Sequence, residues 1–163
     1  DPLASRDDAS AVFSSLYAWA DWERELGSNF SLEMAGRGQI ASAPLLSTED
    51  LGLGGNRFLR GYPYSQRSGD QGIMGSGELR YDRDDALGLL DSMQIYAYAD
   101  GGYVGNLENG RGTGDLYSAG GGLRTDIVSG LDFDIEVAVP LSGPRYDTDD
   151  DNPRVNVRLR KSL

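Results

Sequence analysis

Segments of about ten residues in this chain alternate between apolar and polar side chains, and they recur along most of its length. Successive side chains of a β-strand point to opposite faces, so a period of two predicts strands whose faces meet different surroundings. The alternation predicts seven strands, at 10–25, 29–41, 72–83, 93–104, 115–125, 131–141 and 154–163. We therefore expect an all-β, antiparallel fold. The first strand ends in Trp19, Asp21, Trp22 and Glu23, and the pattern leaves its faces unassigned.

The two faces of the predicted strands differ in a way that favours a membrane. The polar face carries full charges of both signs in mid-strand, at Glu33, Arg37, Glu78, Arg80, Glu136 and Arg158. The apolar face, with Leu32, Ile95 and Ile135, is crowded with Gly and Ala and lacks the bulk that fills a sandwich core. Lipid-facing residues of a barrel need only be apolar, whereas its polar lumen accepts charges. A transmembrane β-barrel is thus favoured over a soluble antiparallel sheet with one wet face.

Long and short connections alternate between the predicted strands. The connections 42–71, 105–114 and 142–153 are long, 26–28 and 126–130 are short, and 84–92 is intermediate. In outer-membrane barrels the long loops are extracellular and the short turns periplasmic, which places the C-terminus in the periplasm. Single-chain bacterial barrels have even strand counts, and lipid does not tolerate an open sheet edge. Seven strands, and an opening segment that is not a signal peptide, predict a piece of a longer protein or one that closes with a second copy.

Composition argues against several classes of function. The net charge of −11 disfavours a nucleic-acid partner, which requires a basic face. Without Cys or His, the chain has no disulfide framework, no thiolate or imidazole metal site, and no Ser-His or Cys-His catalysis. The acidic run 147–152 begins like a calcium loop, but Asn152 and Arg158 stand where Gly and Glu are required. We expect neither an enzyme nor a bound cofactor.

Two short motifs lead to a family. The long loop contains Leu59-Arg60-Gly61-Tyr62, and a later strand contains Tyr98-Ala99-Asp100-Gly101-Gly102. In this order they resemble the signatures of two-partner secretion (TpsB) transporters: V/L-R-G-F/Y on a long loop folded into the barrel, and F-x-D-x-G on a strand after it. That family exports haemolysins and adhesins, and belongs to the outer-membrane insertion and secretion barrels that carry POTRA domains. The segments 68–72, 120–124 and 139–141 extend the resemblance, which covers roughly residues 29–163.

The resemblance implies that residues 1–163 form the C-terminal portion of a sixteen-stranded outer-membrane barrel, with the loop 42–71 folded into the lumen. It implies that Arg60 meets Asp100 on the barrel wall, where a guanidinium and a carboxylate can pair bidentately. The alternative is a surface ion pair worth less than about 1 kcal/mol. The remaining expected site residues are Gly61 for a tight turn, Leu59 and Tyr62 of the loop motif, Tyr98 and Gly102 of the wall, and the lumen charges Glu78, Arg80, Arg124 and Glu136.

The resemblance also implies partners. We expect a secreted exoprotein, outer-membrane lipid and lipopolysaccharide, and the barrel-assembly machinery during biogenesis. The family ends in Phe where this chain has Leu163, so recognition by that machinery is expected to be weaker. Three alternatives stay open: an outer-membrane insertion or assembly factor, the barrel of a fused, autotransporter-like passenger, and, less favoured, a soluble β-sandwich binding module.

Overall fold

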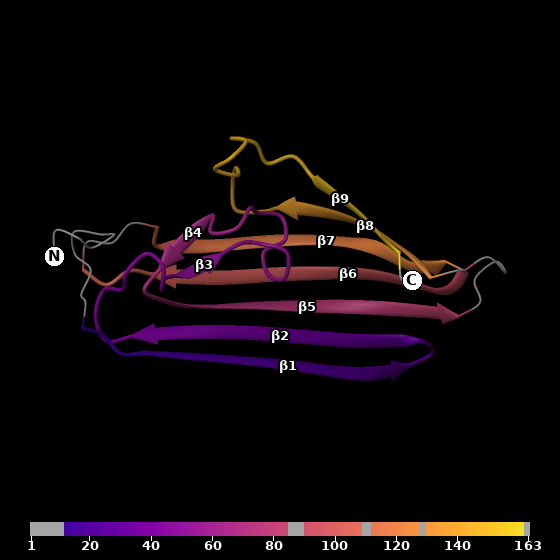
Figure 1. Ribbon diagram of the computed structural model, residues 1–163, viewed down its shortest axis with the longest axis horizontal. Helices are drawn as coiled ribbons and strands as arrows, with labels where there is room; N and C mark the ends of the chain where they lie inside the picture. The colour runs from indigo at the N-terminus through magenta and orange to yellow at the C-terminus, as the bar shows by residue number, and fades with distance from the viewer. Residues whose placement is uncertain (1–11, 85–89, 109–111, 128–129, 162–163) are drawn as a thin grey trace.

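Residues 12–84, 90–108, 112–127 and 130–161 are described by a computed structural model. Seven strands form one antiparallel sheet in the order β1-β2-β5-β6-β7-β8-β9 (Figure 1). Their bounds are β1 Ser15–Gly27, β2 Phe30–Ala41, β5 Gln71–Asp84, β6 Leu90–Gly105, β7 Gly114–Ile127, β8 Leu131–Pro140 and β9 Arg154–Lys161. Two short strands, β3 (Leu51–Leu53) and β4 (Arg67–Gly69), pair with each other inside the β2–β5 connection.

The predicted all-β class and the antiparallel pairing of the seven predicted strands are confirmed, whereas β3 and β4 were not predicted. The first strand begins at Ser15, later than predicted, and β6 begins at Leu90, which shortens the β5–β6 connection. Leu163 and the first two residues of the predicted strand 10–25 lie outside the described residues. No helix in the described ranges is long and apolar enough to cross a membrane.

A two-residue turn between β1 and β2 assigns the faces of the first strand. Ser28 and Asn29 have φ values of 53° and 68°, the backbone that a type I′ hairpin turn requires at both central positions. In the resulting register, Trp22 lies opposite Met34 and Trp19 lies opposite Arg37. Directly opposed residues of antiparallel strands share a face, so the two tryptophans of β1 lie on opposite faces of the sheet.

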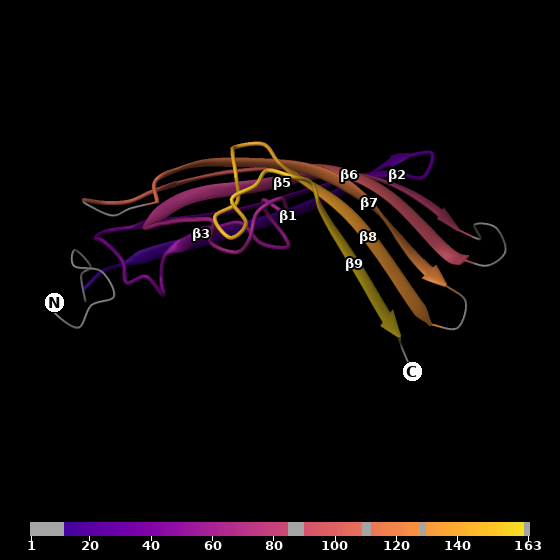
Figure 2. The same cartoon turned by 90° about the horizontal axis from the view of Figure 1, so that it is seen from above.

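The sheet is bent, and its two faces differ as the alternation predicted (Figure 2). The long β2–β5 connection, with β3, lies on the inside of the bend, which we call the inner face. The outer face exposes apolar side chains, among them Ile73 (66%), Ile95 (50%) and Val157 (63%). On the inner face, Glu78 and Asp100 are only 5% and 4% exposed. Charged residues are therefore buried and apolar ones exposed, the reverse of a soluble sheet with one wet face.

The edges of the sheet are β1 and β9, which do not pair with each other. Six successive antiparallel pairings separate them, so the two strands run in the same direction. Within one copy, and between two copies oriented in the same direction, β1 and β9 therefore cannot pair antiparallel. This geometry rules out antiparallel closure through that pairing in either arrangement.

An apolar cluster fixes the β2–β5 connection to the inner face. Leu53, Phe58, Leu59 and Tyr62 of the connection pack with inner-face residues, and the cluster comprises Leu51, Leu53, Phe58, Leu59, Tyr62, Met74, Val104 and Leu116. Gly102 makes the contact possible, because a Cβ there would lie 2.9 Å from Leu53 Cδ2 and 3.0 Å from Met74 Cβ. The connection is thus a packed layer on the sheet.

Replacing Leu53 with Ala tests this packing. Leu53 is fully buried, so the lost apolar contact and the resulting cavity should lower the free energy of unfolding by about 2–5 kcal/mol. Chemical denaturation of the complete protein in detergent measures the change. Tyr64→Ala is the control, because Tyr64 belongs to the same connection and is 73% exposed. Equal stability of the two variants would contradict a packed connection.

Candidate functional site

The tetrapeptide 59–62 forms a turn against the inner face. The Tyr62 amide donates to the Leu59 carbonyl at 2.9 Å, and Leu59 has a φ of 57°, in the left-handed region. Gly61 is one of the two central residues of this turn, while the left-handed backbone is at Leu59. Gly61 also permits close approach: a Cβ there would lie 2.8 Å from the Pro140 nitrogen and 3.0 Å from Ser118 Cβ. Any side chain at Gly61 would push the turn off the sheet.

The turn points Arg60 at Asp100 on β6. Two guanidinium nitrogens, Nε and Nη2, donate to the two carboxylate oxygens of Asp100, both at 3.2 Å. The backbone amide of Arg60 donates to the same carboxylate at 3.0 Å, as does the Ser118 hydroxyl at 3.2 Å. Both ionic side chains are almost fully buried, at 7% and 0% exposure. The geometry is bidentate, which fixes the orientation of the loop as well as its distance from the wall.

Further groups on the inner face of the sheet complete the surroundings of the Arg60 guanidinium. Nη1 donates to Glu78 at 2.7 Å and Nη2 to the Ser76 hydroxyl at 3.1 Å. The guanidinium carbon lies 3.2 Å from the centre of the Tyr98 ring, a stacked cation–π contact. Burial by itself lowers the pKa of Arg60, but hydrogen bonds and charges from Asp100 and Glu78 raise it above its ordinary value. Arg60 is therefore a permanently charged group, paired on all sides.

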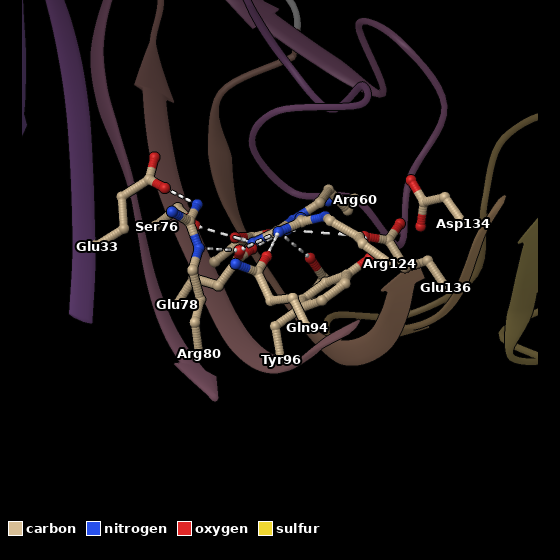
Figure 3. A network of polar contacts seen from close by, with 12 residues as sticks. Glu33, Arg60, Ser76, Glu78, Arg80, Gln94, Tyr96, Arg124, Asp134 and Glu136 are labelled. Carbon is tan, nitrogen blue, oxygen red and sulfur yellow. Dashed lines mark hydrogen bonds and ion pairs between the residues drawn. The ribbon is translucent and has the colours of Figure 1, made fainter. Parts of the chain in front are cut away.

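Glu78 connects this pair to a wider network across the inner face (Figure 3). Its Oε1 accepts from Arg80 at 2.8 Å and from Arg124 at 2.9 Å. Arg80 also pairs with Glu33 on β2. On the other side, the Tyr96 hydroxyl donates to Glu136 at 3.0 Å, and Glu136 lies 3.7 Å from Arg60. The network thus joins four expected lumen charges on β5, β7 and β8 to the tetrapeptide.

Two tyrosine rings form the floor beneath the guanidiniums. Tyr96 and Tyr98 on β6 lie opposite Gly122 and Gly120 on β7. A Cβ at Gly120 would lie 2.5 Å from the Tyr98 hydroxyl oxygen, and one at Gly122 would lie 2.6 Å from that of Tyr96. The rings therefore lie across the space that the glycines leave open. Arg124 stacks on Tyr96 at 3.7 Å, as Arg60 stacks on Tyr98.

Tyr62 of the loop motif lies away from the ion pair. It is fully buried in the apolar cluster, and its hydroxyl accepts from the Ser142 amide at 2.7 Å and donates to the Gly143 carbonyl at 3.3 Å. Tyr98 is the aromatic residue that packs against the pair. Among the described residues, no group of three or more His, Cys, Asp or Glu is placed to hold a metal.

Sequence reasoning missed Asp70 at the base of the long connection. Asp70 is fully buried, and its carboxylate accepts from the backbone amides of Leu45 at 2.6 Å and Leu107 at 2.7 Å. It thereby joins both ends of the β2–β5 connection region to the β6–β7 loop. Only the Ser-Gly-Asp-x-Gly run 68–72 marked this position, and that pattern did not reveal which backbone amides Asp70 binds.

The chain is similar to known proteins both in its sequence and in its fold. A family model described as Haemolysin secretion/activation protein ShlB/FhaC/HecB matches residues 4–125. The solved structure of CdiB from Escherichia coli is similar, with a TM-score of 0.76 and 23% sequence identity, over 90% of this chain. The chain spans 27% of the CdiB chain. No curated protein matches.

Gly120→Ala tests the floor beneath the guanidiniums. The new methyl group would overlap the Tyr98 hydroxyl and the Val137 carbonyl, at 2.5 and 2.2 Å, so overpacking should lower the free energy of unfolding by about 1–3 kcal/mol. Gly77→Ala on β5 is the matched control, because nothing lies within 4 Å of its added Cβ. The account of the floor fails if thermal denaturation in detergent finds the two variants equally stable.

Proposed function

The chain belongs to the haemolysin secretion/activation family ShlB/FhaC/HecB, and from this premise we propose that it forms the C-terminal part of an outer-membrane β-barrel that secretes a partner exoprotein. The long β2–β5 connection lies in the barrel lumen in this proposal. The observation that carries it is the buried pairing of Arg60 with Asp100 and Glu78, which fixes a loop to the charged side of a sheet whose other side is apolar.

The exposed outer face supports a lipid environment. Its large apolar residues are contiguous over the sheet and include Phe30, Met34, Ile73, Leu79, Ile95, Tyr103, Tyr117, Val137, Val155, Val157 and Leu159. Contiguous apolar surface of this kind marks contact with lipid or protein. Aromatic residues lie near both ends, with the Phe30 and Tyr81 rings 4.9 Å apart at one end and Tyr103 and Tyr117 at the other. Outer-membrane barrels carry such aromatic girdles at both membrane interfaces.

The distance between the aromatic ends suits a membrane. Tyr103 is opposite Ile73 on β5, eight positions from Tyr81 on the same strand, or roughly 26 Å along the strand. A strand tilted by about 40° spans roughly 20 Å of that distance across the bilayer, close to the band of about 25 Å in such barrels. In this orientation the long loops are extracellular, next to lipopolysaccharide, and β9 ends at the periplasmic side.

The proposed role of the site is positional. The tetrapeptide holds the loop against the wall, and the wall residues Asp100, Tyr98 and Gly102 receive the guanidinium and the loop's Leu53 side chain. No step of bond making or breaking is needed, so the proposal is a transporter and not an enzyme. Strands beyond those described here would pair with β1 and β9 and complete the barrel. Neither the family match nor the fold favours an insertion factor, a fused passenger or a soluble module.

Arg60→Ala and Asp100→Ala in the complete transporter test this role. Each removes one partner of a buried ion pair and leaves the other unpaired, a cost of about 3–5 kcal/mol, so the loop should leave its position. Secretion of the partner exoprotein into the medium should fall at least ten-fold, while the amount of folded barrel in outer-membrane fractions stays near that of the parent. Unchanged secretion in both variants would refute the role.

Ile95→Arg tests the lipid-facing side. Ile95 lies on the outer face of β6, opposite Tyr81 at one aromatic end, and is 50% exposed, so an arginine there would stand at the edge of the hydrocarbon and cost up to about 1 kcal/mol. Folding into lipid vesicles, followed by urea titration, measures the loss. Gln94→Arg is the comparison, since Gln94 lies on the polar inner face beside Arg124 and Asp82. A smaller loss of stability for Ile95→Arg than for Gln94→Arg would show that the face with Gln94, and not the face with Ile95, meets the lipid.

A further inference from the structure

The side of the tetrapeptide that faces away from Asp100 is also held, by the β8–β9 loop (141–153). The Tyr62 hydroxyl bonds to both the Ser142 amide and the Gly143 carbonyl, at 2.7 and 3.3 Å. These two bonds use the hydroxyl fully, as donor and as acceptor. A phenylalanine in the same place would keep the ring in the apolar cluster and lose only these bonds.

Arg145 is the second contact from that loop. It is 6% exposed, and it organises its own loop by donating to the Asn152 carbonyl at 2.8 Å and the Thr148 hydroxyl at 3.2 Å, and by pairing with Asp150. Its Nη1 also donates to the carbonyl of Gly61 at 3.4 Å. Gly61 lies between Arg60, which the sheet binds, and Tyr62, which the β8–β9 loop binds. Arg145 therefore contacts the centre of the tetrapeptide.

Gln66 provides a third contact, just after the tetrapeptide. Its amide nitrogen donates to the Pro144 carbonyl at 3.0 Å, and its amide oxygen accepts from the Tyr146 backbone at 3.0 Å. Paired donor and acceptor bonds to one backbone segment fix the relative position of two loops, because both must align at once. Together with Tyr62 and Arg145, Gln66 connects segments about eighty positions apart in the chain.

We infer that the β8–β9 loop is a strap that keeps the tetrapeptide seated on the wall, with Tyr62, Gln66 and Arg145 as its positioning residues. This inference rests on the proposed function, in which the seated tetrapeptide supports secretion. Arg60 is held by charge from the wall, and the strap prevents the turn from lifting off. The strap also carries the exposed acidic residues Asp147, Asp149 and Asp151.

Hydrogen exchange on the complete transporter in detergent tests the strap. Tyr62→Phe should speed exchange of the Ser142 amide, which loses its acceptor, and also of the amides of residues 60 and 62 about five-fold, the size expected for one lost hydrogen bond. The amides of residues 60 and 62 bond to Asp100 and Leu59 and not to the hydroxyl. Faster exchange there reports that the tetrapeptide itself is less firmly seated. The inference is overturned if the Ser142 amide alone changes.

Matched controls separate the strap from general loosening. Tyr64→Phe makes the same substitution two positions away at an exposed ring and should leave all three amides unchanged. Arg145→Ala should speed exchange at residues 60 and 62, whereas Asp149→Ala, at an exposed position of the same loop, should not. Equal effects of Arg145→Ala and Asp149→Ala would refute the role of Arg145.

Secretion is measured in the same variants. Tyr62→Phe and Arg145→Ala should secrete less than their controls, in the order of their exchange rates. If the exchange rates change as stated but the parent protein secretes nothing, the strap is retained and the proposed function is rejected. Normal secretion by the parent with unchanged exchange in Tyr62→Phe and Arg145→Ala would reject the strap and retain the proposed function.

Discussion

The guanidinium of Arg60 is a buried cation, and the position of the long connection depends on it. Burying an ion costs several kcal/mol unless its surroundings replace water. Here Asp100 and Glu78 supply charge, Ser76 a hydroxyl oxygen and Tyr98 the face of its ring. Because removing any one of these partners leaves a buried charge partly unmatched, the four groups act together. The tetrapeptide is therefore bound in one well-defined position on the inner face.

Burial of apolar surface and pairing of charge divide the inner face into two zones. Met74, Val104 and Leu116 lie under the long connection and form an apolar zone, while the ionic network lies beside it. Within the described residues the outer face has no such cover, and most of its side chains are apolar. In the proposed barrel, the exposed apolar side faces lipid and the buried charges face a polar interior. The CdiB-like fold agrees with this division.

The strand pattern and the faces of most strands could be predicted because they depend on local periodicity. Even the inward position of Arg124, assigned by analogy, agrees with its contacts to Glu78 and Gln94. Details that depend on distant segments could not be predicted. Gly61 is small because Pro140 and Ser118 approach it, and Tyr62 turns away because its hydroxyl meets Ser142. The apolar residues under the connection break the inner-face polarity, and only the packed loop explains them.

A double-mutant cycle tests the central claim, that Arg60 and Asp100 interact as a buried pair in the folded barrel. The free energies of unfolding in lipid of the parent, Arg60→Met, Asp100→Asn and the double variant give the coupling energy directly. The buried geometry predicts that the double variant is more stable than the sum of the single losses implies, with a coupling of about 2–3 kcal/mol. A coupling below about 1 kcal/mol, as for an exposed surface pair, would contradict the account.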